Sequence, residues 1–317
     1  MENNYHSNHP TMDLTALLCS ENLSQVNDQY HYGGGNNNRI DYNLEVQSQV
    51  DQALLLDERV LNNMLAAERR DNVLSDYCNN GVQTLIKPHM RKIVADWLLE
   101  VCEDQCCAPA VFHLAVSYMD RFLSQCPGLD KKFYQCLASG CLLLASKFSE
   151  VRPITTEKLS LYTDYSVLPE ELKHWELKIL NVLNWELSAV TAQSFIEHFI
   201  QQQQNIQQTS AKLATTIQRH AEILAATAAT EYKFLMVRPS LMAAAALSAA
   251  CQGLNSTATA SFRLPKQLAK YGEQIEILVC HLESLLQAYT NSSTVVSEPS
   301  VCGSLLNLKK RKEDIIS

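Results

Sequence analysis

The residues of this sequence best suited to chemistry are a group of cysteines followed by a histidine: Cys102, Cys106, Cys107 and His113. Thiolate and imidazole groups are ligands that zinc prefers, but structural zinc sites use paired C-x₂-C spacings, and this sequence has none. Cys102 also belongs to a helical stripe of apolar residues, which places it in a protein interior. We therefore interpret these residues as ordinary reduced cysteines and predict no metal site.

No other pattern in the sequence predicts catalysis or a bound cofactor. The run Gly33–Gly35 lacks the preceding strand and following helix that a phosphate-binding loop needs. Neither G-x-x-x-x-G-K nor H-E-x-x-H occurs anywhere in the chain. We therefore find no catalytic constellation in the sequence and expect no cofactor.

Composition and charge narrow the class of protein. Of 317 residues, 46% are hydrophobic and 7% aromatic, with nine glycines and nine prolines, a balance that favours helices over sheets. The net charge of −8 leaves no domain with the basic surplus typical of nucleic-acid binding. The eleven cysteines are unevenly spaced and no secretory signal opens the chain, so we expect a reducing, intracellular compartment. The longest uncharged stretch, 239–262, is rich in alanine and broken by polar residues, so no membrane partner is predicted.

Both ends of the chain have the composition of flexible arms. Residues 1–50 are rich in Asn, Gln, Ser and His, hold one arginine against six acidic residues, and show no sustained apolar period. Residues 291–317 are similar in composition and end in a basic cluster. We therefore expect the folded part of the protein to lie between the two arms.

Between the arms, apolar residues recur with a helical period almost throughout. A stripe at Met90, Ile93, Val94, Trp97 and Leu98 predicts a helix that starts after Pro88. The segment 137–145 is apolar all round, as in a helix at the centre of a core. Further helices are predicted over 54–65, after Pro109, over 156–162 and after Pro169.

The second half repeats this scheme. Helices are predicted over 192–203, 211–227, 240–251, 266–270 and 272–289, and the central one is again apolar all round. It lies 104 residues beyond its counterpart, a spacing that fits a duplicated domain better than a short repeat. We predict an all-α protein with two tandem five-helix domains, over 51–188 (with a preceding helix) and 189–290.

Three strings identify a family. Met90-Arg91-Lys92-Ile93-Val94-Ala95-Asp96-Trp97, then Tyr118-Met119-Asp120-Arg121-Phe122-Leu123, then Leu144-Ala145-Ser146-Lys147-Phe148 resemble the cyclin box. Ile179–Leu187 is similar to the close of a first box, and Phe195–Phe199 to the opening of a second. The amino-acid sequences of these strings and of Tyr162-Thr163-Asp164 look most like those of an animal D-type cyclin. The resemblance covers about residues 52–290 and implies two cyclin boxes in a regulatory subunit.

The resemblance implies a kinase contact at Lys147 and Glu176. From the residues alone, these are two solvated charges whose pairing contributes at most about 1 kcal/mol. In the family, a lysine and a glutamate at the matching positions hydrogen-bond the kinase beside its mobile helix. We therefore expect both residues to bind a cyclin-dependent kinase.

The resemblance also implies a docking groove. Met90, Ile93, Trp97 and Glu100 share one helix face, a pattern that by itself is typical of ordinary core. In cyclins the matching Met, Ile and Trp stay partly exposed and, with the acidic residue, take up Arg-x-Leu motifs of substrates and kinase inhibitors. The family places a glutamine beside this groove, matched here by Gln135.

Leu17, Cys19 and Glu21 form the pattern L-x-C-x-E in the N-terminal arm. An extended segment can place Leu17 and Cys19 in apolar holes of a partner while Glu21 meets helix-terminal amides or a basic rim. D-type cyclins are similar in carrying this motif, which docks the retinoblastoma-type pocket protein; chance composition is the alternative.

Three further features of the sequence bear on structure and location. Asp120 and Arg121 are expected to pair locally, and Phe122 to lie in the core. The cluster Lys309-Lys310-Arg311-Lys312 is of the kind that import receptors bind, so we expect a nuclear and cytoplasmic location. No proline follows Ser or Thr, so the tail Thr-Pro phosphorylation site of vertebrate D-type cyclins is absent.

The resemblance implies an activating subunit of a cyclin-dependent kinase of the 4/6 class. The complex would phosphorylate retinoblastoma-type pocket proteins and drive the G1/S transition. Two alternatives stay open: a cyclin-fold adaptor that activates no kinase, and a two-box transcription factor, which the acidic net charge disfavours.

Overall fold

The computed structural model describes residues 54, 57–71, 75–207, 211–253 and 262–293. All of them belong to one compact unit, Val50–Ser317. The described residues form helices and loops and contain no strand. The sequence prediction of an all-α fold is therefore confirmed.

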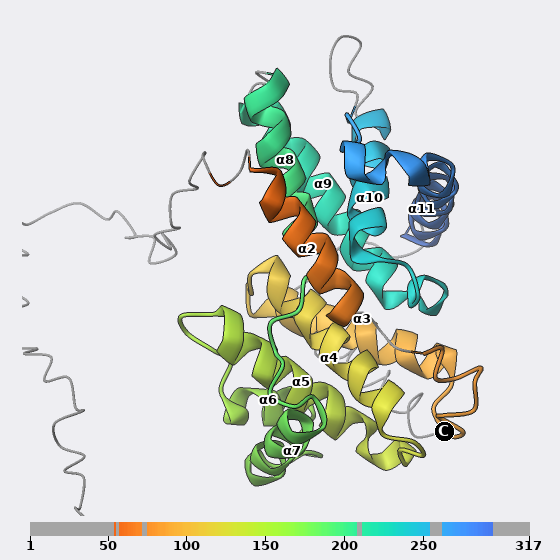
Figure 1. Ribbon diagram of the computed structural model, residues 1–317. Coiled ribbons are helices and arrows are strands. Elements are labelled where there is room, and N and C mark those ends of the chain that lie inside the picture. Colours follow the sequence, from red (N-terminus) through yellow and green to blue (C-terminus); the bar gives the residue numbers. More distant parts are fainter. Residues whose placement is uncertain (1–53, 55–56, 72–74, 208–210, 254–261, 294–317) are drawn as a thin grey trace, which may run out of the picture. The chain divides into compact units, whose positions relative to one another are not determined.

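The first box surrounds a central helix that is buried on every side (Figure 1). Its elements are α3 (Pro88–Asp104), α4 (Pro109–Gln125), the short 3₁₀ helix η3 (Lys131–Phe133), α5 (Tyr134–Ser149), α6 (Thr156–Tyr162) and α7 (Pro169–Val182). Prolines begin α3, α4 and α7, where the missing N–H has no intrahelical partner to lose. At Gly140 of α5, an added Cβ would lie 2.7 Å from Cδ1 of Ile179, so glycine allows α7 to pack closely on α5.

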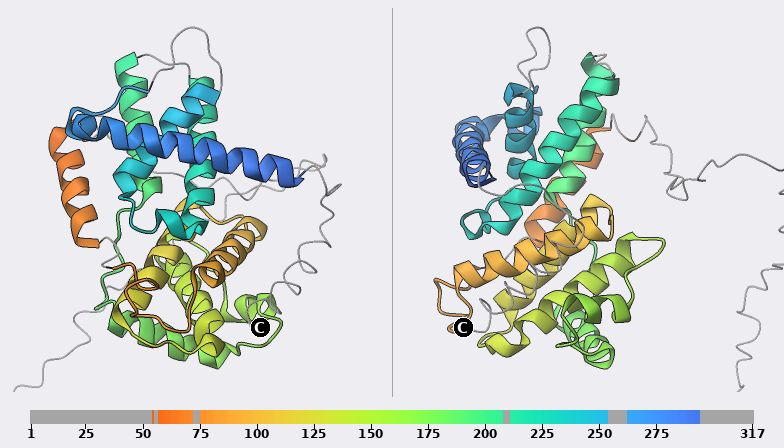
Figure 2. Two further views of the ribbon diagram at one scale, coloured as in Figure 1. Left: turned by 90° about the vertical axis from the view of Figure 1, so that its right-hand side faces the viewer. Right: turned by 180° about the vertical axis from the view of Figure 1, so that it is seen from behind.

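The second box repeats this plan around α10, which is also buried on all sides and rich in alanine. Its elements are α8 (Ala192–Gln207), α9 (Ala211–Thr230), η4 (Tyr232–Phe234), α10 (Pro239–Gly253), η5 (Lys266–Tyr271) and α11 (Gly272–Ser293). Figure 2 shows α11 crossing the outer side of α10. Segment 266–271 is a 3₁₀ helix, and α11 extends four residues beyond the predicted end.

A preceding helix, α2 (Glu58–Asp71), packs on the second box although it leads into the first. It begins later than the apolar pattern predicts, because the Asp57 carboxylate accepts a hydrogen bond of 2.9 Å from the Arg59 N–H and so caps the helix there. At the other end, the buried carboxylate of Glu68 accepts 2.6 Å and 3.0 Å bonds from the backbone and hydroxyl of Ser240, at the start of α10. Burial raises the pKa of Glu68.

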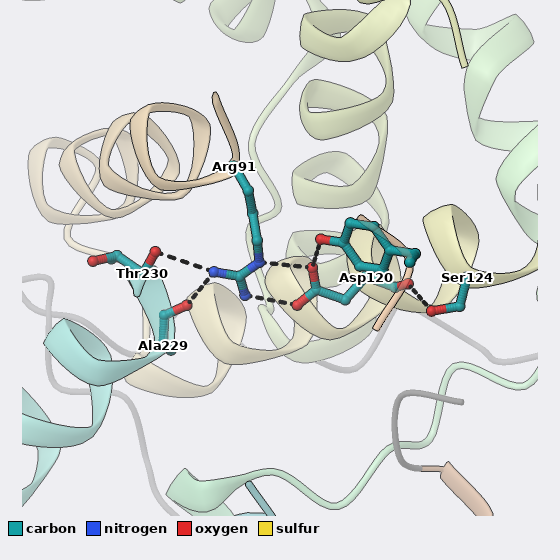
Figure 3. Close-up of polar contacts among 6 residues, drawn as sticks. Arg91, Asp120, Ser124, Ala229 and Thr230 are labelled. Atoms are coloured by element: carbon teal, nitrogen blue, oxygen red, sulfur yellow. Dashed lines mark hydrogen bonds and ion pairs between the residues drawn. The ribbon is translucent and has the colours of Figure 1, made fainter. Parts of the chain in front are cut away.

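Arg91 joins the two boxes (Figure 3). Its guanidinium binds both carboxylate oxygens of Asp120, at 2.9 Å and 2.7 Å, and donates 3.0 Å and 3.1 Å bonds to the carbonyls of Ala229 and Thr230, at the end of α9. These carbonyls lack partners within their own helix. One buried side chain of the first box therefore caps a helix of the second.

The expected local pairing of Asp120 with Arg121 is wrong. Asp120 pairs with Arg91, 29 residues earlier in the chain, while Arg121 donates a 2.9 Å bond to the carbonyl of Glu186. Adjacent helical residues point in different directions, so each side chain meets a different neighbouring segment. Phe122 lies in the core as predicted.

Candidate functional site

Lys147 and Glu176 form an ion pair on the surface of the first box. The Lys147 ammonium lies 2.6 Å and 2.8 Å from the two carboxylate oxygens of Glu176. The lysine side chain is 45% exposed and the glutamate side chain 17%. Lys147 stands in the last turn of α5, where a cation also interacts favourably with the helix dipole. The pair is thus accessible to a partner.

The chain after α5 is held in place by two polar contacts. The buried Ser146 hydroxyl accepts a 2.6 Å bond from the Ile154 N–H, and Glu150 accepts a 2.7 Å bond from the Ala108 N–H, at the start of α4. Both contacts lie within three residues of Lys147. They fix the end of α5 before any partner arrives, which lowers the entropic cost of binding.

Exposed apolar side chains flank the ion pair in sequence. Phe148 follows Lys147, Leu177 follows Glu176, and Trp185 lies just beyond α7; they are 51%, 56% and 64% exposed. Large exposed apolar groups beside charges are typical of protein interfaces. No role for these residues was predicted from the sequence, although Leu177 is out of phase with the buried stripe of α7.

Backbone conformation holds Trp185 in its exposed position. Asn184 and Trp185 both have positive φ, 52° and 62°, and the Trp185 N–H donates a 2.9 Å bond to the carbonyl of Leu180. Non-glycine residues rarely adopt this conformation, and it costs on the order of 1 kcal/mol for each. The fold therefore maintains an exposed tryptophan at a strained turn.

The groove residues on α3 are divided between core and surface. Met90 and Trp97 are 2% and 4% exposed, so the expectation that they stay partly exposed is wrong. They face the interior of the first box because α3 lies against both α4 and α5. Ile93 and Glu100 are partly exposed. Gln135 accepts a 3.2 Å bond from the Ser166 hydroxyl, which ties it to the loop before α7.

Two groups of predicted site residues lie outside the described residues. They are the L-x-C-x-E residues Leu17, Cys19 and Glu21, and the basic cluster Lys309, Lys310, Arg311 and Lys312. Within the part of the chain that the structure describes, no cluster of three metal-ligating side chains occurs. Nor is any described helix long and apolar enough to cross a membrane.

Comparison with known sequences agrees with this architecture. The family described as "Cyclin, N-terminal domain" matches residues 59–188, and "Cyclin, C-terminal domain" matches residues 190–299. G1/S-specific cyclin-D2 of Rattus norvegicus is 40% identical over 270 residues, which cover 80% of this chain and 92% of that protein. G1/S-specific cyclin-D3 of Homo sapiens is 39% identical over 251 residues, or 79% of this chain and 84% of that protein.

A solved structure shows the same fold. The X-ray structure of a viral cyclin from herpesvirus saimiri aligns with a TM-score of 0.60 at 24% identity, over 72% of this chain and 97% of that chain. Two helical boxes around buried central helices define the class, a cyclin-fold protein. The chain belongs to the cyclin family and, within it, to the D-type cyclins. It is therefore a regulatory subunit for a cyclin-dependent kinase with a role at G1/S, and not itself an enzyme.

Proposed function

We propose that the chain activates a cyclin-dependent kinase of the 4/6 class through the surface around Lys147 and Glu176. The observation that carries this proposal is an accessible ion pair whose sequence neighbours Phe148 and Leu177 are exposed apolar residues. Apolar burial supplies affinity, while Lys147 and Glu176 provide hydrogen bonds of defined direction. A smooth apolar patch alone would lack this specificity.

The cyclin contributes binding energy to the reaction and no catalytic group. By binding only the kinase conformation in which the catalytic Lys–Glu pair is formed and the activation loop is open, it shifts the kinase population toward that state. The shift can be no larger than the difference in affinity between the two kinase states. Rigid positioning of Lys147 at the end of α5 favours such discrimination.

We further propose retinoblastoma-type pocket proteins as substrates, held by Leu17, Cys19 and Glu21. Docking raises the local concentration of substrate and makes phosphorylation nearly intramolecular.

The partly exposed Ile93 and Glu100 would receive Arg-x-Leu motifs of substrates and kinase inhibitors, with an apolar contact for leucine and a carboxylate for arginine. The complex would commit the cell to DNA replication. Residues 309–312 would direct part of the protein to the nucleus.

The decisive experiment measures phosphate transfer by a 4/6-class kinase to a retinoblastoma fragment, with and without the purified cyclin. Lys147→Glu places a like charge opposite Glu176, so we expect loss of a contact that contributes about 2–5 kcal/mol to kinase binding and a corresponding loss of activation. The thermal melting temperature should stay within a few degrees of wild type, because exposed ion pairs contribute little to stability.

Lys173→Glu is the matched control, since Lys173 forms another exposed pair on α7, 3.0 Å from Glu170. It should activate the kinase like wild type. If neither the wild-type chain nor this control activates the kinase although both are folded, the adaptor hypothesis replaces the kinase-subunit hypothesis.

Substrate docking is tested separately with the double variant Cys19→Gly and Glu21→Ala. We expect the active complex to phosphorylate the pocket-protein fragment at least about tenfold more slowly at limiting substrate, because the local-concentration effect is lost. Phosphorylation of a short peptide without a docking motif should not change. Equal rates on the pocket protein would refute docking while leaving kinase activation standing.

A further inference from the structure

The end of α3 brings two cysteines together through its backbone. The Cys107 N–H donates a 2.9 Å bond to the carbonyl of Cys102, the Cys106 N–H donates a 3.1 Å bond to that of Glu103, and Cys106 has a positive φ of 52°. This is the Schellman closure of a helix, which is frequently accompanied by a side-chain contact between the first and sixth residues. In this protein the first and sixth residues are Cys102 and Cys107.

The same closure occurs at two other helix ends of the first box. Tyr165 bonds back to the carbonyl of Ser160 at 2.8 Å, and Trp185 to that of Leu180 at 2.9 Å. Those ends pair a serine with a tyrosine and a leucine with a tryptophan. The backbone closure is thus a property of the turn, and of these three ends only that of α3 has cysteines at both the first and the sixth position.

The two thiols differ in accessibility and acidity. Cys102 is buried, whereas Cys107 is only partly buried, and both are unpaired thiols rather than a disulfide. A hydrogen bond between the thiols lowers the pKa of Cys107, with help from the nearby Lys158 charge, and the same bond together with burial raises the pKa of Cys102. Cys107 is therefore the more accessible and the more acidic of these two thiols.

We propose that Cys102 and Cys107 are an oxidation site for hydroperoxides and form a disulfide that closes the end of α3. The Cys107 thiolate attacks the O–O bond of hydrogen peroxide; an S–O bond forms, the O–O bond breaks, and hydroxide leaves to take a proton. The Cys102 sulfur then attacks the Cys107 sulfenic acid, forming the S–S bond and releasing water with the thiol proton. Two thiols and one peroxide give one disulfide and two waters.

A hydrogen bond connects the two cysteines' helix end to the segment that follows Lys147. The next residue, Ala108, donates its N–H to Glu150, three residues beyond Lys147. A Cys102–Cys107 disulfide would restrict the motion of the loop between α3 and α4. The hydrogen bond from Ala108 to Glu150 connects this loop to the end of α5. The proposal stands on the helix end alone and is independent of which kinase the protein binds.

The test uses the full chain, treated with hydrogen peroxide, blocked with N-ethylmaleimide under denaturing conditions and cleaved by trypsin. Cleavage after Lys92 and Arg121 releases one peptide that contains Cys102, Cys106 and Cys107. In a Cys106→Ser variant, we expect this peptide to be lighter by two hydrogens and to carry no maleimide. After reduction it should carry two maleimides.

Cys107→Ser is the matched variant, because it leaves Cys102 beside the exposed Cys106. We expect no crosslink in its peptide and full labelling of Cys102. The proposal fails if this variant crosslinks as readily as Cys106→Ser. It also fails if Cys107 of the Cys106→Ser variant is converted to the sulfinic acid while Cys102 still takes up maleimide.

Discussion

Lys147 and Arg91 show how burial decides what a single charge can do. The Lys147 ammonium is about half exposed, so its ion pair with Glu176 contributes at most about 1 kcal/mol to stability, and the lysine can exchange one partner for another. Arg91 and Asp120 are 2% and 4% exposed, so neither can lose its partner without leaving an uncompensated buried charge. The first pair is suited to binding and the second to holding the fold.

His113 gives a prediction about pH. It is fully buried on α4, and burial lowers its pKa from 6.5 to about 4. The unfolded chain therefore binds a proton below pH 6.5 that the folded chain does not, so stability is present above pH 6.5 and is lost as the pH falls toward 4. The loss amounts to about 3 kcal/mol at most.

The variant His113→Leu keeps an apolar side chain at this position and removes the titration. Urea unfolding between pH 7 and pH 4 should show a shallower decline for this variant than for wild type. The comparison with wild type is needed because Glu68, which lines the same cavity, has a raised pKa and acts in the opposite direction. Parallel curves for the two proteins would contradict the assignment.

Among the helices, α5 and α10 form the centres of the two cores, whereas α3 contributes residues both to the core and to the proposed peptide-binding surface. Residues on all sides of α5 and α10 are buried, so each fills the centre of one box. On α3, Met90 and Trp97 belong to the core, while Ile93 and Glu100 reach the surface. A substitution on α3 therefore tests peptide binding only if it falls on the exposed side.

We expect Ile93→Ala and Glu100→Gln each to weaken binding of an Arg-x-Leu peptide by about tenfold, near 1.4 kcal/mol. Both side chains are only partly exposed and Ile93 also packs on the core, so the melting temperature should fall, but less than for a fully buried position. Fluorescence anisotropy of a labelled peptide would measure this affinity. Glu103→Gln, an exposed acidic position on the same helix, is the control. Trp97→Ala should instead lower stability by about 3–5 kcal/mol, since it empties a core position. Unchanged peptide affinity in both surface variants would place the groove elsewhere.

The two boxes of the molecule are joined by the packing of α3 and α4 on α8 and α9, and by polar contacts at the end of α9. Arg91 binds the carbonyls that end α9, and Lys92 lies 2.5 Å from Glu231, the residue that follows. Near the same point, Tyr232 donates its hydroxyl to Asp76 and accepts a 3.1 Å bond from the Cys78 N–H. Rupture of these contacts should loosen the coupling between boxes.

Arg91→Met tests this coupling, and we expect it to destabilise the protein by about 3–5 kcal/mol, because Asp120 is left buried without its partner. All three tryptophans, Trp97, Trp175 and Trp185, lie in the first box. Tryptophan fluorescence therefore reports on that box, while far-ultraviolet circular dichroism reports on both. The two urea transitions should coincide in wild type and separate in the variant. Coincident transitions at an unchanged midpoint would show that Arg91 does not couple the boxes.

Local patterns were sufficient to predict most of the helices. The apolar period and the prolines before α3, α4 and α7 located these helices to within a few residues, because both signals act within one or two turns. The start of α2 was missed, since the capping contact of Asp57 outweighed the apolar pattern. The 3₁₀ geometry of 266–271 was also missed, because its residues are compatible with either helix type.

The amino-acid sequence was thus enough for the all-α class and the duplicated box, because these depend on periodicity and on strings of neighbouring residues. Only the tertiary structure shows which side chains that are far apart in the sequence contact each other. These are Asp120 with Arg91, Glu68 with Ser240, and Lys147 with Glu176. The tertiary structure also buries Met90 and Trp97. Burial and pairing depend on whatever packs against a helix face, and that neighbour comes from a distant part of the chain.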